Sequence, residues 1–191
     1  MFSRETWAEV SLDNIKENYQ FIKNELKNTQ IVPVVKANAY GHGDFEVASI
    51  FDKNPDVPFL CVASLDEAIS LSSKGIEKDI LIFSYVNPKF VLENNNSQFI
   101  FTIPSLDWYL EVSGKARFHL EINTGMNRMG VKDKTEINQI IEKSVGDIEG
   151  IYTHFISSEY EKRTLEQLNR FEKILKDIKN EFKFVHAGNV S

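Results

Sequence analysis

Short apolar runs alternate along this chain with longer amphipathic stretches. The runs are rich in β-branched and aromatic residues and are bounded by turn residues, which is typical of buried strands. They predict seven core strands, near residues 31, 59, 79, 99, 117, 149 and 183. The clearest amphipathic stretch, Thr164 to Asn180, predicts a helix with Leu165, Leu168 and Phe171 on its apolar stripe. Strand and helix therefore alternate at roughly 20–35 residues, as in βαβ units with a parallel sheet.

This alternation predicts an α/β fold of the (β/α)₈ TIM-type barrel kind. Such a barrel needs eight strands, so seven predicted core strands make an incomplete one. No low-complexity segment or linker interrupts the pattern, and we expect residues 1–191 to form a single domain. Pro33 is unusual for a central strand, because proline lacks the N–H that a ladder needs.

Local signals mark several helix starts. Ser11 is a good N-cap for a helix that follows at once, and Asp44 is expected to cap another. Ser64-Leu65-Asp66-Glu67 has the spacing of a capping box and opens a helix that we expect to end at Gly75.

Composition narrows the class of protein. Apolar residues make up 42% and charged residues 26%, which is ordinary for a globular protein, and the net charge of −6 argues against nucleic-acid or anionic-membrane partners. The one cysteine, Cys61, lies in an apolar run and is expected to be a reduced core residue, which excludes an internal disulfide and a thiolate zinc site. We predict no metal site. The start of the chain lacks the apolar region of a signal peptide and no stretch is long enough to span a membrane, so we expect a cytoplasmic protein.

Lys36 is the first candidate for chemistry. It follows the predicted strand 31–35 and precedes small residues and glycines that leave room for a flat ligand or a phosphate. A poorly solvated lysine amine is a nucleophile toward a carbonyl. The alternative is a strand-end lysine whose amine simply reaches solvent.

Other polar residues end predicted strands, where the active sites of barrels of this kind gather. They are Ser64, Ser84, Thr102, Arg128, His154 and Asn189. The guanidinium of Arg128 is a permanently charged fork of donors suited to a carboxylate. In isolation, however, a loop arginine or a strand-end histidine is more often a solvated or structural group.

Four motifs, in this order, resemble those of the alanine racemase family. Val35-Lys36-Ala37-Asn38-Ala39-Tyr40-Gly41-His42-Gly43 resembles its pyridoxal-phosphate lysine motif, residue for residue. Thr124-Gly125-Met126-Asn127-Arg128-Met129-Gly130 is similar to its second signature, and Thr153-His154-Phe155 to its Thr-His-Phe motif. The run from His186 to Asn189 resembles its loop after strand seven. The resemblance covers nearly the whole chain from Trp7 onward.

The resemblance implies an isomerase that uses pyridoxal 5'-phosphate to interconvert L- and D-alanine, supplying D-alanine for peptidoglycan. Lys36 would hold the cofactor covalently and act as one of two bases. Tyr40 and Asn189 would contact its phosphate, His154 would stack on its pyridine ring, and Arg128 would lie beside the ring oxygen and the substrate carboxylate.

The chain departs from the family pattern at a few positions. Glu121 stands where many members have a lysine, often carbamylated, and we hypothesise that its carboxylate replaces that anion. Asn123 replaces the usual aspartate. Val190 stands where the phosphate-binding serine is expected, and Ser191 is displaced by one position.

The resemblance also implies parts that this sequence does not contain. In family members, which pair as homodimers, a tyrosine on a C-terminal β-domain reaches the partner's site as the second base. We therefore expect the chain to be an N-terminal portion, truncated before strand eight, that alone racemises alanine poorly or not at all. Two alternatives stay open, a non-catalytic pyridoxal-phosphate carrier module and one half of a split racemase.

Overall fold

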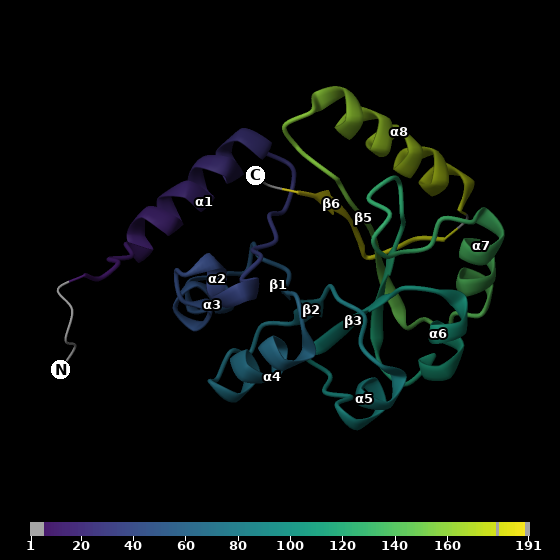
Figure 1. The fold of residues 1–191 in the computed structure, drawn as a ribbon, viewed down its shortest axis with the longest axis horizontal. Helices are drawn as coiled ribbons and strands as arrows, with labels where there is room; N and C mark the ends of the chain where they lie inside the picture. The colour runs from purple at the N-terminus through teal and green to yellow at the C-terminus, as the bar shows by residue number, and fades with distance from the viewer. Residues whose placement is uncertain (1–5, 179, 190–191) are drawn as a thin grey trace. The chain divides into compact units, whose positions relative to one another are not determined.

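A computed structural model describes residues 6–178 and 180–189 of the chain (Figure 1). The chain divides into two compact units, Met1–Ile80 and Leu81–Ser191. Six strands hydrogen-bond in the order in which they occur in the sequence. They are β1 (Leu60–Val62), β2 (Ile80–Ile82), β3 (Phe99–Ile103), β4 (Arg117–Glu121), β5 (Ile148–His154) and β6 (Phe184–Gly188). The pairings of β3 with β4, β4 with β5 and β5 with β6 are parallel, which confirms the α/β class with a parallel sheet.

The strand predicted near residue 31 does not form, so the described residues hold six strands and not seven. In its place Val34 makes one isolated parallel bridge to Cys61. The Val35 N–H donates to the Cys61 carbonyl, and the Cys61 N–H donates to the Pro33 carbonyl, both at 2.9 Å. The ladder stops there because Pro33 has no N–H to donate and the backbone turns sharply after Lys36.

The described residues of the first unit form the short strand β1 and four helices. The helices are α1 (Leu12–Leu26), α2 (Lys36–Tyr40), α3 (Asp44–Asp52) and α4 (Leu65–Ser73), of which α2 and α4 contact β1. The Ser11 hydroxyl accepts the Asn14 N–H at 3.2 Å, which confirms the predicted cap of α1. The predicted cap of α3 is wrong by one residue: Gly43, with a φ of 92°, takes the N-cap position, and Asp44 begins the helix. Cys61 is buried, as expected.

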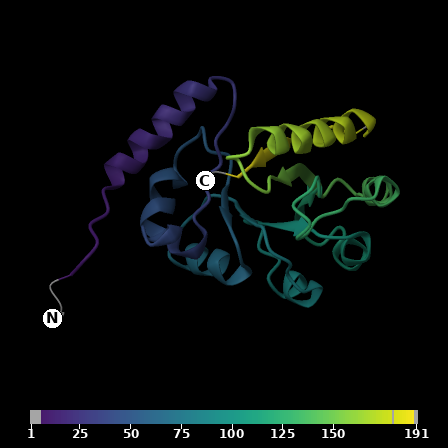
Figure 2. The same cartoon turned by 45° about the horizontal axis from the view of Figure 1, so that its top comes forward.

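In the second unit the strands are joined by α5 (Pro88–Glu93), α6 (Leu106–Val112), α7 (Lys134–Glu142) and α8 (Glu161–Asp177). Figures 1 and 2 show α6, α7 and α8 along the outer side of β3 to β6. The Trp108 indole of α6 donates to the Val86 carbonyl at 2.7 Å and meets the ring of Phe118 on β4 edge to face. These contacts fix α6 against the sheet.

The helix α8 lies three residues earlier than predicted and ends at Asp177 and not at Asn180. Most of its predicted apolar stripe faces the protein: Phe171 is buried and Leu168 is half-buried, whereas Leu165 is exposed. The buried face also includes Gln167, a hydrogen-bonding residue that the apolar pattern did not place there.

Candidate functional site

Lys36 stands directly before a left-handed turn. The next four residues all have positive φ, with values of 52° for Ala37, 55° for Asn38, 47° for Ala39 and 53° for Tyr40. None is glycine, and left-handed backbone costs about 1–2 kcal/mol for each such residue. Segments with this much strain persist only where surrounding contacts enforce them, and they cluster at functional sites.

Hydrogen bonds within the segment close this turn on itself. The Ala39 N–H donates to the Val35 carbonyl at 3.0 Å, and the Gly41 N–H donates to the Asn38 carbonyl at 2.9 Å. The side-chain oxygen of Asn38 accepts the Asp44 N–H at 3.1 Å, which ties the turn to the start of α3.

The side chains of Lys36 and Tyr40 meet across this turn. The Lys36 amine lies 6.0 Å from the centre of the Tyr40 ring, and the tyrosine is 71% exposed. Lys36 itself is half-buried, so the lysine is less enclosed than its place after a buried strand led us to expect. The turn thus presents an amine and a phenol hydroxyl together on the surface of the first unit.

Arg128 lies in a loop between β4 and α7 that is closed at its base by a bridge between Ile122 and Val131. The side-chain oxygen of Asn123 accepts the N–H groups of Gly125 at 3.2 Å and Asn127 at 3.1 Å. An asparagine carbonyl supplies this acceptor as well as a carboxylate does, which gives Asn123 a structural role without a charge. Arg128 itself is exposed at the tip.

Glu121 is buried at the carboxyl end of β4 and is only 3% exposed. The Tyr152 hydroxyl donates to its carboxylate at 3.2 Å and lies 3.0 Å from the Thr102 hydroxyl, which donates to the Ile82 carbonyl. Burial raises the pKa of Glu121 to about 7, against the opposing effects of the Tyr152 hydrogen bond and the Arg128 charge. Its protonated form can donate to Tyr152, which can donate to Thr102, and every hydroxyl in the chain then has an acceptor.

Gln167 of α8 joins the loop of Arg128 to the end of β5. Its side-chain amide donates to the Thr124 hydroxyl at 3.1 Å and to the His154 carbonyl at 3.3 Å, and its oxygen accepts the Ile156 N–H at 3.0 Å. One buried side chain therefore links the loop of Arg128 to the segment that ends β5.

Asn189 follows β6 and holds the segment after His154. Its side-chain amide donates to the Phe155 carbonyl at 3.0 Å. His154 pairs in register with Gly188, the residue before Asn189. One amide hydrogen of Asn189 is therefore engaged within the protein, and the predicted departures at Val190 and Ser191 lie outside the described residues.

Two histidines of the second unit, buried His119 on β4 and half-buried His186 on β6, form a pair. Nδ1 of His119 lies 2.9 Å from Nε2 of His186, and the His186 ring stacks on Tyr152 with centroids 4.7 Å apart. Burial lowers the pKa of His186 to about 4 and that of His119 well below its ordinary value, so both are neutral near pH 7. His119 is a core residue.

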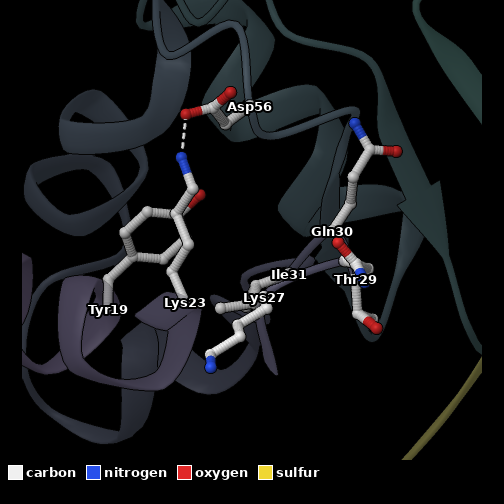
Figure 3. A pocket seen from close by; sticks show the side chains of 8 residues that line it. Tyr19, Lys23, Lys27, Thr29, Gln30, Ile31 and Asp56 are labelled. Atoms are coloured by element: carbon white, nitrogen blue, oxygen red, sulfur yellow. Dashed lines mark hydrogen bonds and ion pairs between the residues drawn. The ribbon is translucent and has the colours of Figure 1, made fainter. Parts of the chain in front are cut away.

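A cavity of about 260 Å³ lies elsewhere in the first unit, beside α1 and the segment that follows it (Figure 3). Lys23 and Asp56, which both line the cavity, form an ion pair. Neither Lys36 nor Tyr40 lines this cavity. Within residues 6–178 and 180–189 there is no helix long and apolar enough to cross a membrane and no cluster of three or more metal-ligating side chains.

The predicted site residues are thus divided between the units. The first unit brings Lys36 and Tyr40 together. The second places His154 and Asn189 at the carboxyl ends of β5 and β6, and Arg128 in the loop that follows β4. The sequence did not indicate that Gln167 links the loop of Arg128 to the end of β5. It could have been found only as a polar residue inside an apolar helical face.

These features define a parallel α/β protein whose polar side chains gather where its strands end. Residues 10–191 match the family model of the alanine racemase N-terminal domain, and the chain belongs to that family.

Individual relatives agree with this family. The chain is 36% identical to alanine racemase 1 of Bacillus subtilis and 35% identical to an alanine racemase of Streptococcus pyogenes serotype M6, in each case over 98% of its own length. It covers 51% and 54% of these two proteins, so it spans about half the length of the curated relatives that it matches.

Solved structures give the same picture. The structure of a Clostridium difficile 630 alanine racemase in complex with cycloserine matches 98% of this chain and 56% of its own, with a TM-score of 0.88 and 30% identity. A Bacillus anthracis alanine racemase with bound L-Ala-P matches with a TM-score of 0.78 and 29% identity.

Proposed function

We propose that the chain is the cofactor-binding part of a pyridoxal-phosphate-dependent racemase that acts on alanine. The observation that carries this proposal is Lys36, a half-buried amine set by a strained left-handed turn within a motif that matches the family's cofactor lysine. We also propose that the parallel strands are part of a (β/α)₈ barrel and that the chain forms one N-terminal domain of it.

The donor set fits an aromatic aldehyde that carries a phosphate. Lys36 supplies a primary amine for the aldehyde, and the Tyr40 hydroxyl and the remaining amide hydrogen of Asn189 are donors suited to phosphate oxygens. The planar imidazole of His154 suits an aromatic ring face, and the guanidinium of Arg128 suits a carboxylate. When bound, pyridoxal phosphate delocalises into its ring the negative charge left by loss of an α-proton.

In this proposal each side chain has one task. Lys36 would hold the cofactor, and its amine would take or return the proton at the α-carbon of alanine. Arg128 binds the substrate carboxylate and so orients the α C–H bond. The Asn123 and Gln167 hydrogen bonds described above hold Arg128's loop and His154 in place for this purpose.

Racemisation also requires a base on the opposite face of the α-carbon. By family resemblance that base is a tyrosine outside this sequence, contributed by a partner subunit. A chain with one base should exchange the α-hydrogen of one alanine enantiomer without interconverting the two.

The test is proton exchange in D₂O, followed by NMR on L- and D-alanine separately, with the purified chain and pyridoxal phosphate. We expect one enantiomer to exchange faster than the other, and Lys36→Ala to exchange no faster than pyridoxal phosphate alone. Lys53→Ala, which removes an exposed lysine of the same unit, is the matched control and should behave as the wild type. Cofactor binding without exchange would favour the carrier-type module, and exchange that persists in Lys36→Ala would refute the assignment of the lysine.

A further inference from the structure

The left-handed turn after Lys36 begins with a backbone group that the turn itself does not satisfy. Within the turn the described hydrogen bonds engage the N–H groups of Ala39 and Gly41, but the Ala37 N–H points away to another element. Its acceptor is a carboxylate oxygen of Glu67, 2.8 Å away on α4. This contact joins the lysine segment to a residue thirty positions later in the chain.

Glu67 uses its two oxygens for two different purposes. One accepts the N–H groups of Ala63 at 2.7 Å and Ser64 at 3.1 Å, which completes the predicted capping box together with the Ser64 hydroxyl. The other oxygen accepts only Ala37 among the described contacts. Capping α4 accounts for the first set of bonds but not for the second.

The bond to Ala37 fixes the direction of Lys36. The peptide group between these two residues is planar, so an acceptor that holds its N–H also sets the ψ angle of Lys36. From that point the backbone enters four residues of positive φ, which no local preference of alanine or tyrosine would maintain. An ionised carboxylate is the strongest acceptor that a side chain offers for this purpose.

We propose that Glu67 is a positioning residue for Lys36: its free carboxylate oxygen holds the left-handed turn and thereby aims the lysine amine. The inference rests on the proposed function, because it assigns Glu67 a part in presenting the cofactor lysine. It adds a residue that lies outside the four motifs and acts through the backbone of the lysine segment.

The first measurement needs no cofactor. Amide hydrogen exchange is followed by mass spectrometry over residues 36–43 in the wild type, Glu67→Ala and Ser64→Ala. Ser64→Ala is the matched control, because it removes the hydroxyl of the same capping box and leaves the bond to Ala37. We expect Glu67→Ala to speed exchange in this segment by at least about tenfold and Ser64→Ala to leave it unchanged, since hydrogen bonds to charged groups are the stronger ones.

The second measurement follows the chromophore on Lys36. Pyridoxal phosphate is added, and the rate of its attachment and its induced circular dichroism in the visible region are recorded. We expect Glu67→Ala to slow attachment by about tenfold and to weaken the dichroic band, because the amine is no longer held in one direction. In the double variant Glu67→Ala/Ala37→Gly the band should recover in part, because glycine adopts positive φ without strain.

The outcomes separate the two proposals. Wild-type protein that attaches no pyridoxal phosphate at Lys36 overturns the proposed function and the role of Glu67 with it. Wild-type attachment together with a Glu67→Ala variant that matches Ser64→Ala in exchange, rate and dichroism overturns the role of Glu67 alone. Faster exchange in Glu67→Ala with unchanged attachment and dichroism also overturns it, because Glu67 would then hold the backbone without aiming the amine.

Discussion

Glu121→Gln should stabilise the second unit at neutral and alkaline pH. Glu121 is buried beside Tyr152 and its pKa is raised to about 7 from an ordinary value of 4.5, chiefly by burial. Its protonated form completes the hydrogen-bond chain through Tyr152 to Thr102. A glutamine amide can donate to the same hydroxyl and carries no charge at any pH.

The magnitude follows from the two pKa values. Between pH 4.5 and 7 the unfolded chain has lost the proton of Glu121 while the folded chain still holds it, so the free energy of unfolding falls as the pH rises. At about 1.4 kcal/mol per pH unit over this interval, the loss amounts to about 3 kcal/mol, complete above pH 7. Glu121→Gln abolishes the loss, so the variant should match the wild type below pH 4.5 and exceed it by about 3 kcal/mol at pH 8.

The assay is urea unfolding at intervals from pH 4.5 to 8, followed by the fluorescence of Trp108, which packs on Phe118 of the same strand, β4. The quantity of interest is the difference in unfolding free energy between variant and wild type at each pH, in which contributions from other groups cancel. Glu142→Gln, at an exposed position of α7, is the matched control and should give a flat difference. A flat difference for Glu121→Gln as well would refute the reasoning.

Three further predictions concern the interior of the second unit. Gly150→Ala should cost about 1–3 kcal/mol of stability in urea unfolding, because a Cβ there would lie 2.6 Å from ring atoms of His119. Gly188→Ala, where a Cβ would meet open space, should cost far less. Gln167→Leu should cost about 2–4 kcal/mol by removing the three hydrogen bonds of its side chain, whereas exposed Gln139→Leu should be near neutral in the same assay. His186, whose pKa is lowered by burial to about 4 from 6.5, stabilises the fold above pH 6.5 and loses that contribution as the pH falls toward 4. Between pH 6.5 and 4 the wild type should therefore lose about 3 kcal/mol of unfolding free energy that His186→Gln does not lose. A difference in unfolding free energy between variant and wild type that stays constant over this range would contradict the prediction.

Features with a local cause could be predicted from the sequence. The caps of α1 and α4 follow from Ser11, and from Ser64 with Glu67, each within four residues of the groups that it satisfies. The strands β1 to β6 follow from short apolar runs, although β6 is not buried. These signals place His154 at the end of a strand, which is confirmed, and they place Arg128 among the strand ends, whereas it lies seven residues beyond β4 in a loop.

Features held by distant contacts could not be predicted. Ala37 and Tyr40 give no sign of positive φ, because the acceptor that helps hold the turn belongs to α4. The apolar pattern of α8 could not show that Gln167 would be buried in place of Leu165, since its partners lie on a loop and a strand. Pro33 indicated that a central strand near residue 31 was unusual. Only the structure shows that this segment forms a single bridge and no strand.

The central claim is that pyridoxal phosphate becomes attached to the amine of Lys36. Its most direct test is reduction of the cofactor-loaded chain with borohydride, followed by proteolysis and mass spectrometry of the peptides. We expect one pyridoxyl group per chain, located on Lys36 and absent from Lys36→Ala. A label spread over exposed lysines, or one located at a different residue, would contradict it.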